Sequence, residues 1–277
     1  MKADVSIVVP TCQYGHFIEE ALDSVFAQTV EPLEVLVFDD GSTDGTADLV
    51  RERYGGRARV ASGPHRGVYS VRQEALGRIS GSWFLNLDAD NRIPPDFLET
   101  LLAAVRKGPE SLAFVYPDRI HFGRRRYRVQ VPEYDPRCFL RGNFVDMNAL
   151  VRTDAARSVG FDASFNEGWG DYDFFLSLAE AGYTGRAEHG TALEYRIHDA
   201  SLTARAGHDL GRNQRLMREI IQKHQAFFSD EEARMALARY TPRAARRNIV
   251  GGLLRDGRIR KAVQTWFALG KEIRHHE

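Results

Sequence analysis

Cysteine is scarce in this 277-residue chain, and long apolar runs are missing. The two cysteines, Cys12 and Cys138, are too few for a disulfide framework and lack the paired spacing of a zinc site, which favours a reducing compartment. No stretch approaches the roughly 18 apolar residues that a membrane-spanning helix needs, and the apolar opening Met1–Val9 is too short for a secretory signal. We therefore expect a cytoplasmic protein that does no cysteine chemistry.

Net charge is absent overall, because 38 Lys and Arg balance 38 Asp and Glu. This balance hides an asymmetry: residues 205–277 carry 16 basic and 8 acidic residues, which leaves 22 basic and 30 acidic residues for 1–204. An acidic main body argues against nucleic acid as a partner and suits a site that holds a metal. We expect a catalytic domain at 1–204 and a basic helical C-terminal region at 205–277.

Strand-like and helix-like patterns alternate along the first part of the chain. Apolar runs predict strands at Val5–Pro10, Glu34–Phe38, Ala58–Ser62 and Trp83–Leu87, with helices at 18–26, 47–50 and 68–79 between them. This alternation predicts an α/β fold with a mostly parallel sheet and helices on both faces. Further along, the patterns predict a helix at 97–105, strands at 112–116, 148–152 and 192–197, an antiparallel ribbon at 120–131, a helix at 172–181 and successive helices in 209–277.

Polar side chains follow three of the predicted strands: Pro10-Thr11, Asp39-Asp40 and Asp88–Asn91. Ligands of parallel sheets bind outside the carboxyl ends of the strands, so these residues are the first functional signal. Asp88 and Asp90 alternate along an extended segment, which would turn both carboxylates toward one Mg²⁺ or Mn²⁺ ion. Two structural alternatives stay open: a turn with two solvated aspartates, and a 39–45 loop whose polar residues only cap the following helix.

Several motifs, in this order and spacing, resemble family 2 glycosyltransferases of the GT-A (Rossmann-like) fold. They are Val5–Thr11, Ala21–Thr29, Glu34–Thr46, Gly67 with Val71-Arg72, Asp88–Asn91, Asn148–Arg152, Gly160–Asp162, Asp171–Phe174 and Tyr195–His198. The resemblance covers about residues 4–203 and implies a nucleotide-sugar donor and a divalent metal.

The resemblance also implies roles for individual residues. Pro10, Thr11 and Asp40, with Asp39 beside them, would hold the base of the nucleotide, and Arg72 would lie near the nucleotide. Asp88 would contact the ribose and Asp90 the metal. His198 matches a position near the diphosphate and the metal, although a surface or packing role is equally open for it.

One departure from the family pattern concerns Asp171. Relatives commonly carry Glu-Asp at this point, whereas this chain has Gly170-Asp171, with Glu167 three residues before Gly170. A carboxylate at the acceptor mouth can take a proton from the attacking hydroxyl, so Asp171 is the candidate general base. The alternative is that Asp171 only caps a helix beginning at Tyr172.

These residues predict a metal-dependent, inverting transferase that moves a sugar from a nucleoside-diphosphate-sugar, UDP-linked by preference, to a carbohydrate or lipid-linked acceptor hydroxyl. The setting would be the synthesis of cell-envelope polysaccharide. A nucleotidyltransferase and an inactive nucleotide-sugar-binding module are the alternatives. Basic residues and apolar stripes in 243–269 predict helices that pack, join subunits in an oligomer, or contact the inner face of a membrane.

Overall fold

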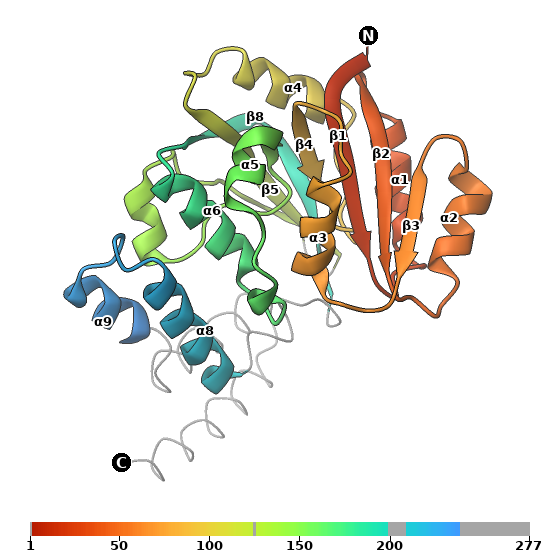
Figure 1. Ribbon diagram of the computed structural model, residues 1–277. Coiled ribbons are helices and arrows are strands. Elements are labelled where there is room, and N and C mark those ends of the chain that lie inside the picture. The colour runs from red at the N-terminus through yellow and green to blue at the C-terminus, as the bar shows by residue number, and fades with distance from the viewer. Residues whose placement is uncertain (1, 124–125, 199–208, 239–277) are drawn as a thin grey trace. The chain divides into compact units, whose positions relative to one another are not determined.

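The computed structural model describes residues 2–123, 126–198 and 209–238 (Figure 1). The chain divides into two compact units, the first formed by Met1–Phe139 and Asn143–Ile197, the second by Leu140–Gly142 and His198–Glu277. The boundary expected after residue 204 lies outside the described residues, as do the helices expected in 243–269. The prediction of membrane contact through those helices therefore stays a prediction.

A parallel sheet forms the N-terminal half of the first unit. Its strands lie in the order β3-β2-β1-β4, with bounds β1 Lys2–Thr11, β2 Glu31–Asp40, β3 Arg59–Gly63 and β4 Trp83–Asn86. Every neighbouring pair among them is parallel. The four strands predicted in this half are confirmed. Their carboxyl ends therefore meet at one edge, where Thr11 lies opposite Asp39.

An antiparallel extension continues the sheet beyond β4. Strand β7 (Leu150–Arg152) runs antiparallel to both β4 and β5 (Leu112–Gly123), and β5 pairs with β6 (Tyr127–Val129) and, in parallel, with β8 (Thr184–Ile197). The predicted strand at 112–116 and the first arm of the ribbon are thus one strand. A register shift at Pro117/Asp118 interrupts its pattern. The prediction also missed the first half of β8, because residues 184–191 are mostly polar.

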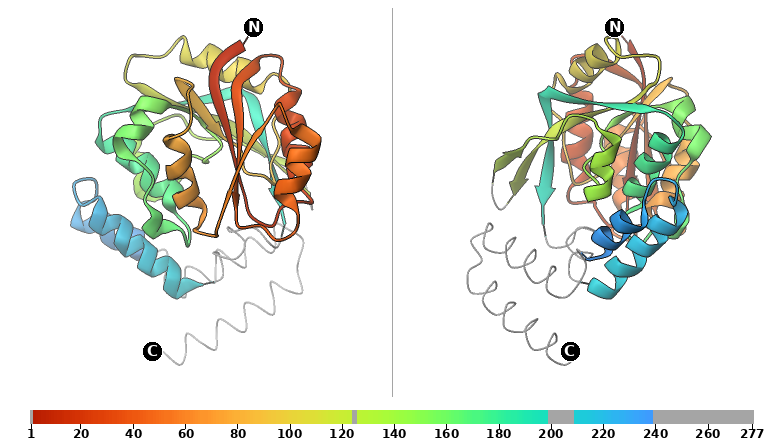
Figure 2. Two further views of the ribbon diagram at one scale, coloured as in Figure 1. Left: turned by 45° about the vertical axis from the view of Figure 1, so that its right-hand side comes forward. Right: turned by 90° about the vertical axis from the view of Figure 1, so that its left-hand side faces the viewer.

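Helices cover both faces of the sheet, as expected (Figure 2). On one face, α1 (Ile18–Phe26), α2 (Thr46–Tyr54) and α4 (Phe97–Val105) share a core with the inward side chains of β1, namely Val5, Ile7 and Val9. On the other lie α3 (Val68–Leu76), α5 (Thr153–Val159) and α6 (Gly170–Glu180), with the ring of Phe175 on α6 centred 5.0 Å from that of Phe114 on β5. The described residues also form two 3-10 turns, η1 at Pro136–Arg141 and η2 at Ala163–Phe165.

The described part of the second unit is helical. Helix α8 (Leu210–Lys223) is capped by Asp209, whose carboxylate accepts a hydrogen bond from the Arg212 N–H at 2.9 Å, and α9 (Asp230–Ala238) follows it. The apolar stripe of α8, with Leu216, Met217 and Ile220, is buried. This agrees with the expected helical region. Among the residues described, none of the helices combines the length and apolar character needed to cross a membrane.

Candidate active site

The carboxyl ends of β1 and β2 carry the residues expected around the nucleotide. Pro10 and Thr11 close β1 and are buried. The Oγ1 atom of Thr11 is buried with no hydrogen-bond partner among the described residues. Leaving a buried hydroxyl unpaired costs roughly 1–3 kcal/mol. A ligand that hydrogen-bonds this hydroxyl would remove that cost, which makes Thr11 a fitting member of a binding site.

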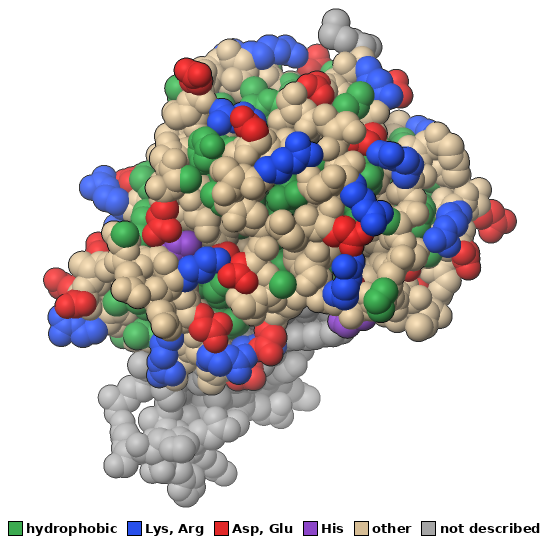
Figure 3. Space-filling model, in the orientation of Figure 1, with side chains coloured by type: hydrophobic (Ala, Val, Ile, Leu, Met, Phe, Trp, Pro, Cys, Tyr) green, Lys and Arg blue, Asp and Glu red, His purple; other side chains and the backbone are tan. Residues whose placement is uncertain are grey.

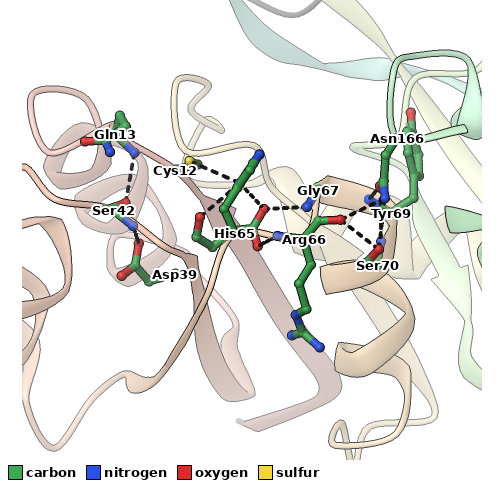
Figure 4. Close-up of polar contacts among 11 residues, drawn as sticks. Cys12, Gln13, Asp39, Ser42, His65, Arg66, Gly67, Tyr69, Ser70 and Asn166 are labelled. Carbon is green, nitrogen blue, oxygen red and sulfur yellow. Dashed lines mark hydrogen bonds and ion pairs between the residues drawn. The ribbon is translucent and has the colours of Figure 1, made fainter.

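The two aspartates at the end of β2 shape the loops around this edge (Figure 4). Asp40 Oδ1 accepts a hydrogen bond from the Arg66 N–H at 2.7 Å, and its Oδ2 accepts one from the Gly67 N–H at 2.9 Å. His65 Nδ1 lies 2.9 Å from the same Oδ2. Asp39 accepts a hydrogen bond from the Ser42 N–H at 3.2 Å. Asp40 thus fixes the loop that leads into α3, a role separate from the predicted contact with a base.

The helix-capping alternative for the 39–45 loop is also visible. Asp44 Oδ1 accepts a hydrogen bond from the Thr46 N–H at 3.1 Å at the start of α2, and its Oδ2 accepts one from the Gly15 N–H at 3.0 Å. These contacts lower the pKa of Asp44 below its ordinary value, although burial opposes them. Of the polar residues in the 39–45 loop, Asp44 is therefore the one that accepts the first backbone N–H of α2.

Asp88 belongs to a partly buried network of polar side chains. Its Oδ1 accepts a hydrogen bond from Nη2 of Arg72 at 2.7 Å, and its Oδ2 accepts one from Nδ2 of Asn148 at 2.9 Å. The N–H of Asp88 donates to Oδ1 of Asn148 at 2.9 Å. Asn148 Nδ2 also donates to Asp146 at 2.5 Å. Arg72 reaches Asp88 from α3, while Asn148 holds it from the segment before β7.

Burial is the main cause that raises the pKa of Asp88, to about 6. The carboxylates of Asp90 and Asp146 add to the increase in the pKa, whereas Arg72 lowers it. Arg72 is 5% exposed and its guanidinium lies 5.1 Å from the centre of the Tyr69 ring. The site is thus rich in negative charge and carries a buried cation at its base.

Asp90 lies in a turn and not in the extended segment expected from the sequence. The Asn91 N–H donates to the Asp88 carbonyl at 2.9 Å, and Asp90 is 9% exposed. Arg196 on β8 fixes this turn, because its Nε donates to the Asp90 carbonyl and its N–H to Oδ1 of Asn91, both at 2.9 Å. The turn is therefore present, but the alternative of two solvated aspartates is not, because Asp90 is buried.

Asp171 lies in the first turn of α6, one residue after that helix begins. Its Oδ2 accepts a hydrogen bond from Nδ2 of Asn143 at 2.8 Å, and its Oδ1 accepts one from the Tyr172 N–H at 2.9 Å. Burial, followed by the carboxylate of Asp146, raises the pKa of Asp171, and Arg72 is among the groups that oppose the increase. A carboxylate with a raised pKa is the stronger base, as a proton acceptor requires. Its N-terminal place in α6 also fits the capping alternative.

Comparison with known proteins gives this geometry a context. The sequence model of the family described as glycosyl transferase family 2 matches residues 6–165. The chain belongs to this family. Chondroitin synthase from Pasteurella multocida is 31% identical over 196 residues, covering 64% of this chain and 19% of that protein. Chondroitin synthase from Escherichia coli is 31% identical over 187 residues, covering 64% of this chain and 27% of its own length.

Solved structures agree on the fold of this family 2 chain. TarS 1–349 of S. aureus in complex with UDP-GlcNAc has a TM-score of 0.68 and 17% identity, covering 100% of this chain and 93% of that one. The mannosyltransferase PcManGT of Pyrobaculum calidifontis, in complex with GDP-Man and Mn²⁺, has a TM-score of 0.62 and 19% identity. The match covers 98% of this chain and 87% of that one. At these identities the likeness confirms the GT-A fold expected from the sequence and carries no statement about ligands.

The predicted metal ligands of the family 2 chain, Asp90 and His198, belong to different compact units. His198 follows the last residue of β8 and groups with the second unit, so its role beside Asp90 stays a prediction. Among the described residues, no three His, Cys, Asp or Glu side chains form a ready-made metal cage. Asp90 nevertheless fits Mg²⁺ or Mn²⁺, because these ions are commonly bound through one or two carboxylates and share substrate phosphates.

Sequence reasoning missed the side chains that hold these functional groups in place. Asn148 was part of a quoted motif but had no role, and Asn143 and Tyr69 carried no signal of any kind. His65 had no assigned role in the sequence; its side chain is 69% exposed, and its Nδ1 contacts Asp40 and lies 3.8 Å from the Cys12 sulfur. Arg196 belongs to the quoted motif at 195–198. Its contact with the Asp88–Asn91 turn could be predicted only by knowing that β8 passes this turn.

Proposed function

We propose that this protein is an inverting glycosyltransferase that moves a sugar from a nucleoside-diphosphate donor to a carbohydrate hydroxyl. The chain spans about a fifth to a quarter of the chondroitin synthases it matches, at 19% and 27%. The activity of those whole proteins therefore enters only as support for a carbohydrate acceptor. TarS and PcManGT, in complex with UDP-GlcNAc and GDP-Man, support a nucleotide-sugar donor.

The observation that carries the proposal is the contact of the buried Arg72 with Asp88, together with its electrostatic effect on Asp171. Arg72 contacts Asp88 directly and lowers the pKa of both Asp88 and Asp171 against the effect of burial. It favours the ionised form of both carboxylates. One of them belongs to the donor end of the site and the other to the acceptor end, so a single buried cation serves both ends.

In this proposal each end has its own task. Asp171 accepts the proton of the acceptor hydroxyl as that oxygen attacks the sugar from the face opposite the diphosphate, which inverts the anomeric centre. Asp90, with His198, would hold Mn²⁺ or Mg²⁺, and Asp88 would contact the ribose. The bound ion supplies positive charge that stabilises the leaving diphosphate.

Donor hydrolysis tests the proposal without knowledge of the acceptor, because water can slowly take the place of the acceptor hydroxyl. The full-length protein is incubated with a panel of UDP-sugars and GDP-mannose, with Mn²⁺ or with EDTA, and the release of nucleoside diphosphate is measured. We expect release from one donor, lost with EDTA and in Asp90→Ala. Asp171→Asn should lower the rate by about 10²–10⁴-fold with donor affinity little changed.

A matched control is Asp162→Asn, because Asp162 also accepts a hydrogen bond from a backbone N–H, that of Ser164, at 2.9 Å. This variant should keep full activity. Donor affinity that is the same with EDTA as with Mn²⁺ would remove metal dependence from the proposal. Release of pyrophosphate from a nucleoside triphosphate and a sugar phosphate would favour a nucleotidyltransferase, and binding of donor without any turnover would favour an inactive module.

A further inference from the structure

Tyr69 on α3 joins the two ends of the candidate site. It is 5% exposed, and its hydroxyl oxygen accepts a hydrogen bond from the backbone N–H of Asp171 at 3.0 Å. Its ring contacts the donor end of the proposed site, because the Arg72 guanidinium lies 5.1 Å from the ring centre. Asn166 fixes Tyr69 in turn, since its Oδ1 accepts a hydrogen bond from the Tyr69 N–H at 2.8 Å (Figure 4).

Helix α6 needs an acceptor from elsewhere at its N-terminus. Trp169 stands at the N-cap position with φ +66°, a left-handed conformation that a bulky residue rarely adopts, and its side chain makes no capping hydrogen bond. The first N–H groups of a helix have no partner within the helix. The Tyr69 hydroxyl supplies one for Asp171. Burial raises the pKa of Tyr69, so the phenol stays neutral and adds no negative charge beside Asp171.

The ring of Tyr69 also explains the departure at Gly170. A Cβ atom built at Gly170 would lie 2.7 Å from three carbon atoms of this ring, closer than any Cβ contact allows. The ring is buried and held at its backbone by Asn166, so it cannot swing away as an exposed side chain would. The acidic residue that the family resemblance predicts at this position therefore has no room in this chain.

We propose that Tyr69 is a positioning residue that orients Asp171, and that the Tyr69–Gly170 contact replaces the acidic residue expected before the base. The proposal rests on the role of Asp171 in the proposed function. Tyr69 touches no reacting atom; it acts by fixing the backbone of Asp171 and by supporting Arg72. Its hydroxyl serves the acceptor end of the site and its ring serves the donor end.

Tyr69→Phe separates these two contributions, because it removes the oxygen and keeps the ring. The amide of Asp171 should exchange hydrogen roughly fivefold faster, the loss expected for one hydrogen bond. With the donor found in the hydrolysis panel, kcat should fall severalfold, while the donor KM and the affinity for UDP stay unchanged. Tyr54→Phe is the control, because Tyr54 on α2 is 4% exposed and its hydroxyl donates to Asp23 on α1 at 2.6 Å. It should lower stability and leave kcat and the Asp171 amide unchanged.

A second measurement needs no ligand. Gly170→Ala should lower the melting temperature in the native background, and the same substitution in a Tyr69→Ala background should cost little, because the ring is gone. Additive losses in melting temperature, or an unchanged exchange rate of the Asp171 amide in Tyr69→Phe, would overturn the proposal. If the protein releases nucleotide from no donor, the proposed function fails by itself, and the exchange rates and the variant cycle still decide on Tyr69.

Discussion

Arg72 offers the sharpest test of how the site is held together. Arg72→Met removes the buried charge while keeping much of the side-chain length. The variant loses a charge-assisted hydrogen bond to Asp88 at 2.7 Å and the contact with the Tyr69 ring. It also leaves the carboxylates of Asp88 and Asp171 without the cation that favours their ionised forms.

The expected loss of stability follows from the burial of the two partners. Removing one member of a fully buried ion pair costs roughly 3–5 kcal/mol. Arg72 is 5% exposed but the Asp88 side chain is 30% exposed, so solvent screens part of the interaction. Asn148 also continues to donate to Asp88. We therefore expect a loss of about 3 kcal/mol, which corresponds to a fall in melting temperature of roughly 6–12 °C for a unit of this size.

The control is the same substitution at Arg51, which pairs with Asp48 at 2.8 Å on the surface of α2. Its side chain is 49% exposed and that of Asp48 is 89% exposed. Exposed pairs contribute roughly 0–1 kcal/mol, so Arg51→Met should shift the melting temperature by no more than about 4 °C. Thermal unfolding of both variants decides, with UDP affinity measured in parallel. Equal shifts for the two variants would refute the reasoning that Arg72 stabilises the site as a buried cation.

Two further predictions concern other parts of the first unit. Cys12 follows Thr11 at the end of β1, so UDP with Mn²⁺ should slow the alkylation of Cys12 by iodoacetamide, measured in a Cys138→Ser variant. In a Cys12→Ser variant, UDP should not protect Cys138 from the same reagent. Equal alkylation rates of Cys12 with and without UDP would place it outside the nucleotide site. A hydrogen bond to Asp118, aided by Glu133, raises the pKa of His189 above 6.5, so the charged His189 stabilises the fold fully below pH 6.5 and loses this contribution as the pH rises through its raised pKa. The free energy of unfolding, measured in urea at pH 5.5 and 8.5, should therefore differ by less than about 1 kcal/mol because of His189, and this difference should disappear in His189→Gln. The same pH dependence in both proteins would assign it to other groups.

The order of strands and helices could be predicted where the chain follows simple periodicities. Strand β1 is a run of branched apolar residues that are buried on both faces, and α1 repeats its apolar residues at helical spacing. The ends of these strands pointed to Thr11, Asp39 and Asp88 because ligands of parallel sheets bind at that edge. The first half of β8 could not be predicted from periodicity, because it is polar and its partner strand, β5, lies some seventy residues earlier in the sequence.

The groups that orient the candidate site could not be predicted, because each acts on a residue far away in the sequence. Tyr69 and Asp171 are 102 positions apart, and Asn148 and Asp88 are 60 apart. No local pattern marks a tyrosine that caps a distant helix or an asparagine that holds a carboxylate. Local patterns therefore predicted the acidic residues and the edge of the sheet. Their orientation depends on contacts between distant elements, such as Tyr69 of α3 with Asp171 of α6 and Asn148 with Asp88.

Gly170 shows how the two kinds of information combine. In the sequence, a glycine at this position looks like the loss of an acidic group and raises the alternative of an inactive binding module. In the structure, the same glycine is required by the Tyr69 ring, whose hydroxyl holds the backbone of Asp171. The departure is thus one half of a pair whose other half lies on α3. The departure therefore has a packing cause, because a buried tyrosine ring fills the space that a side chain at position 170 would need.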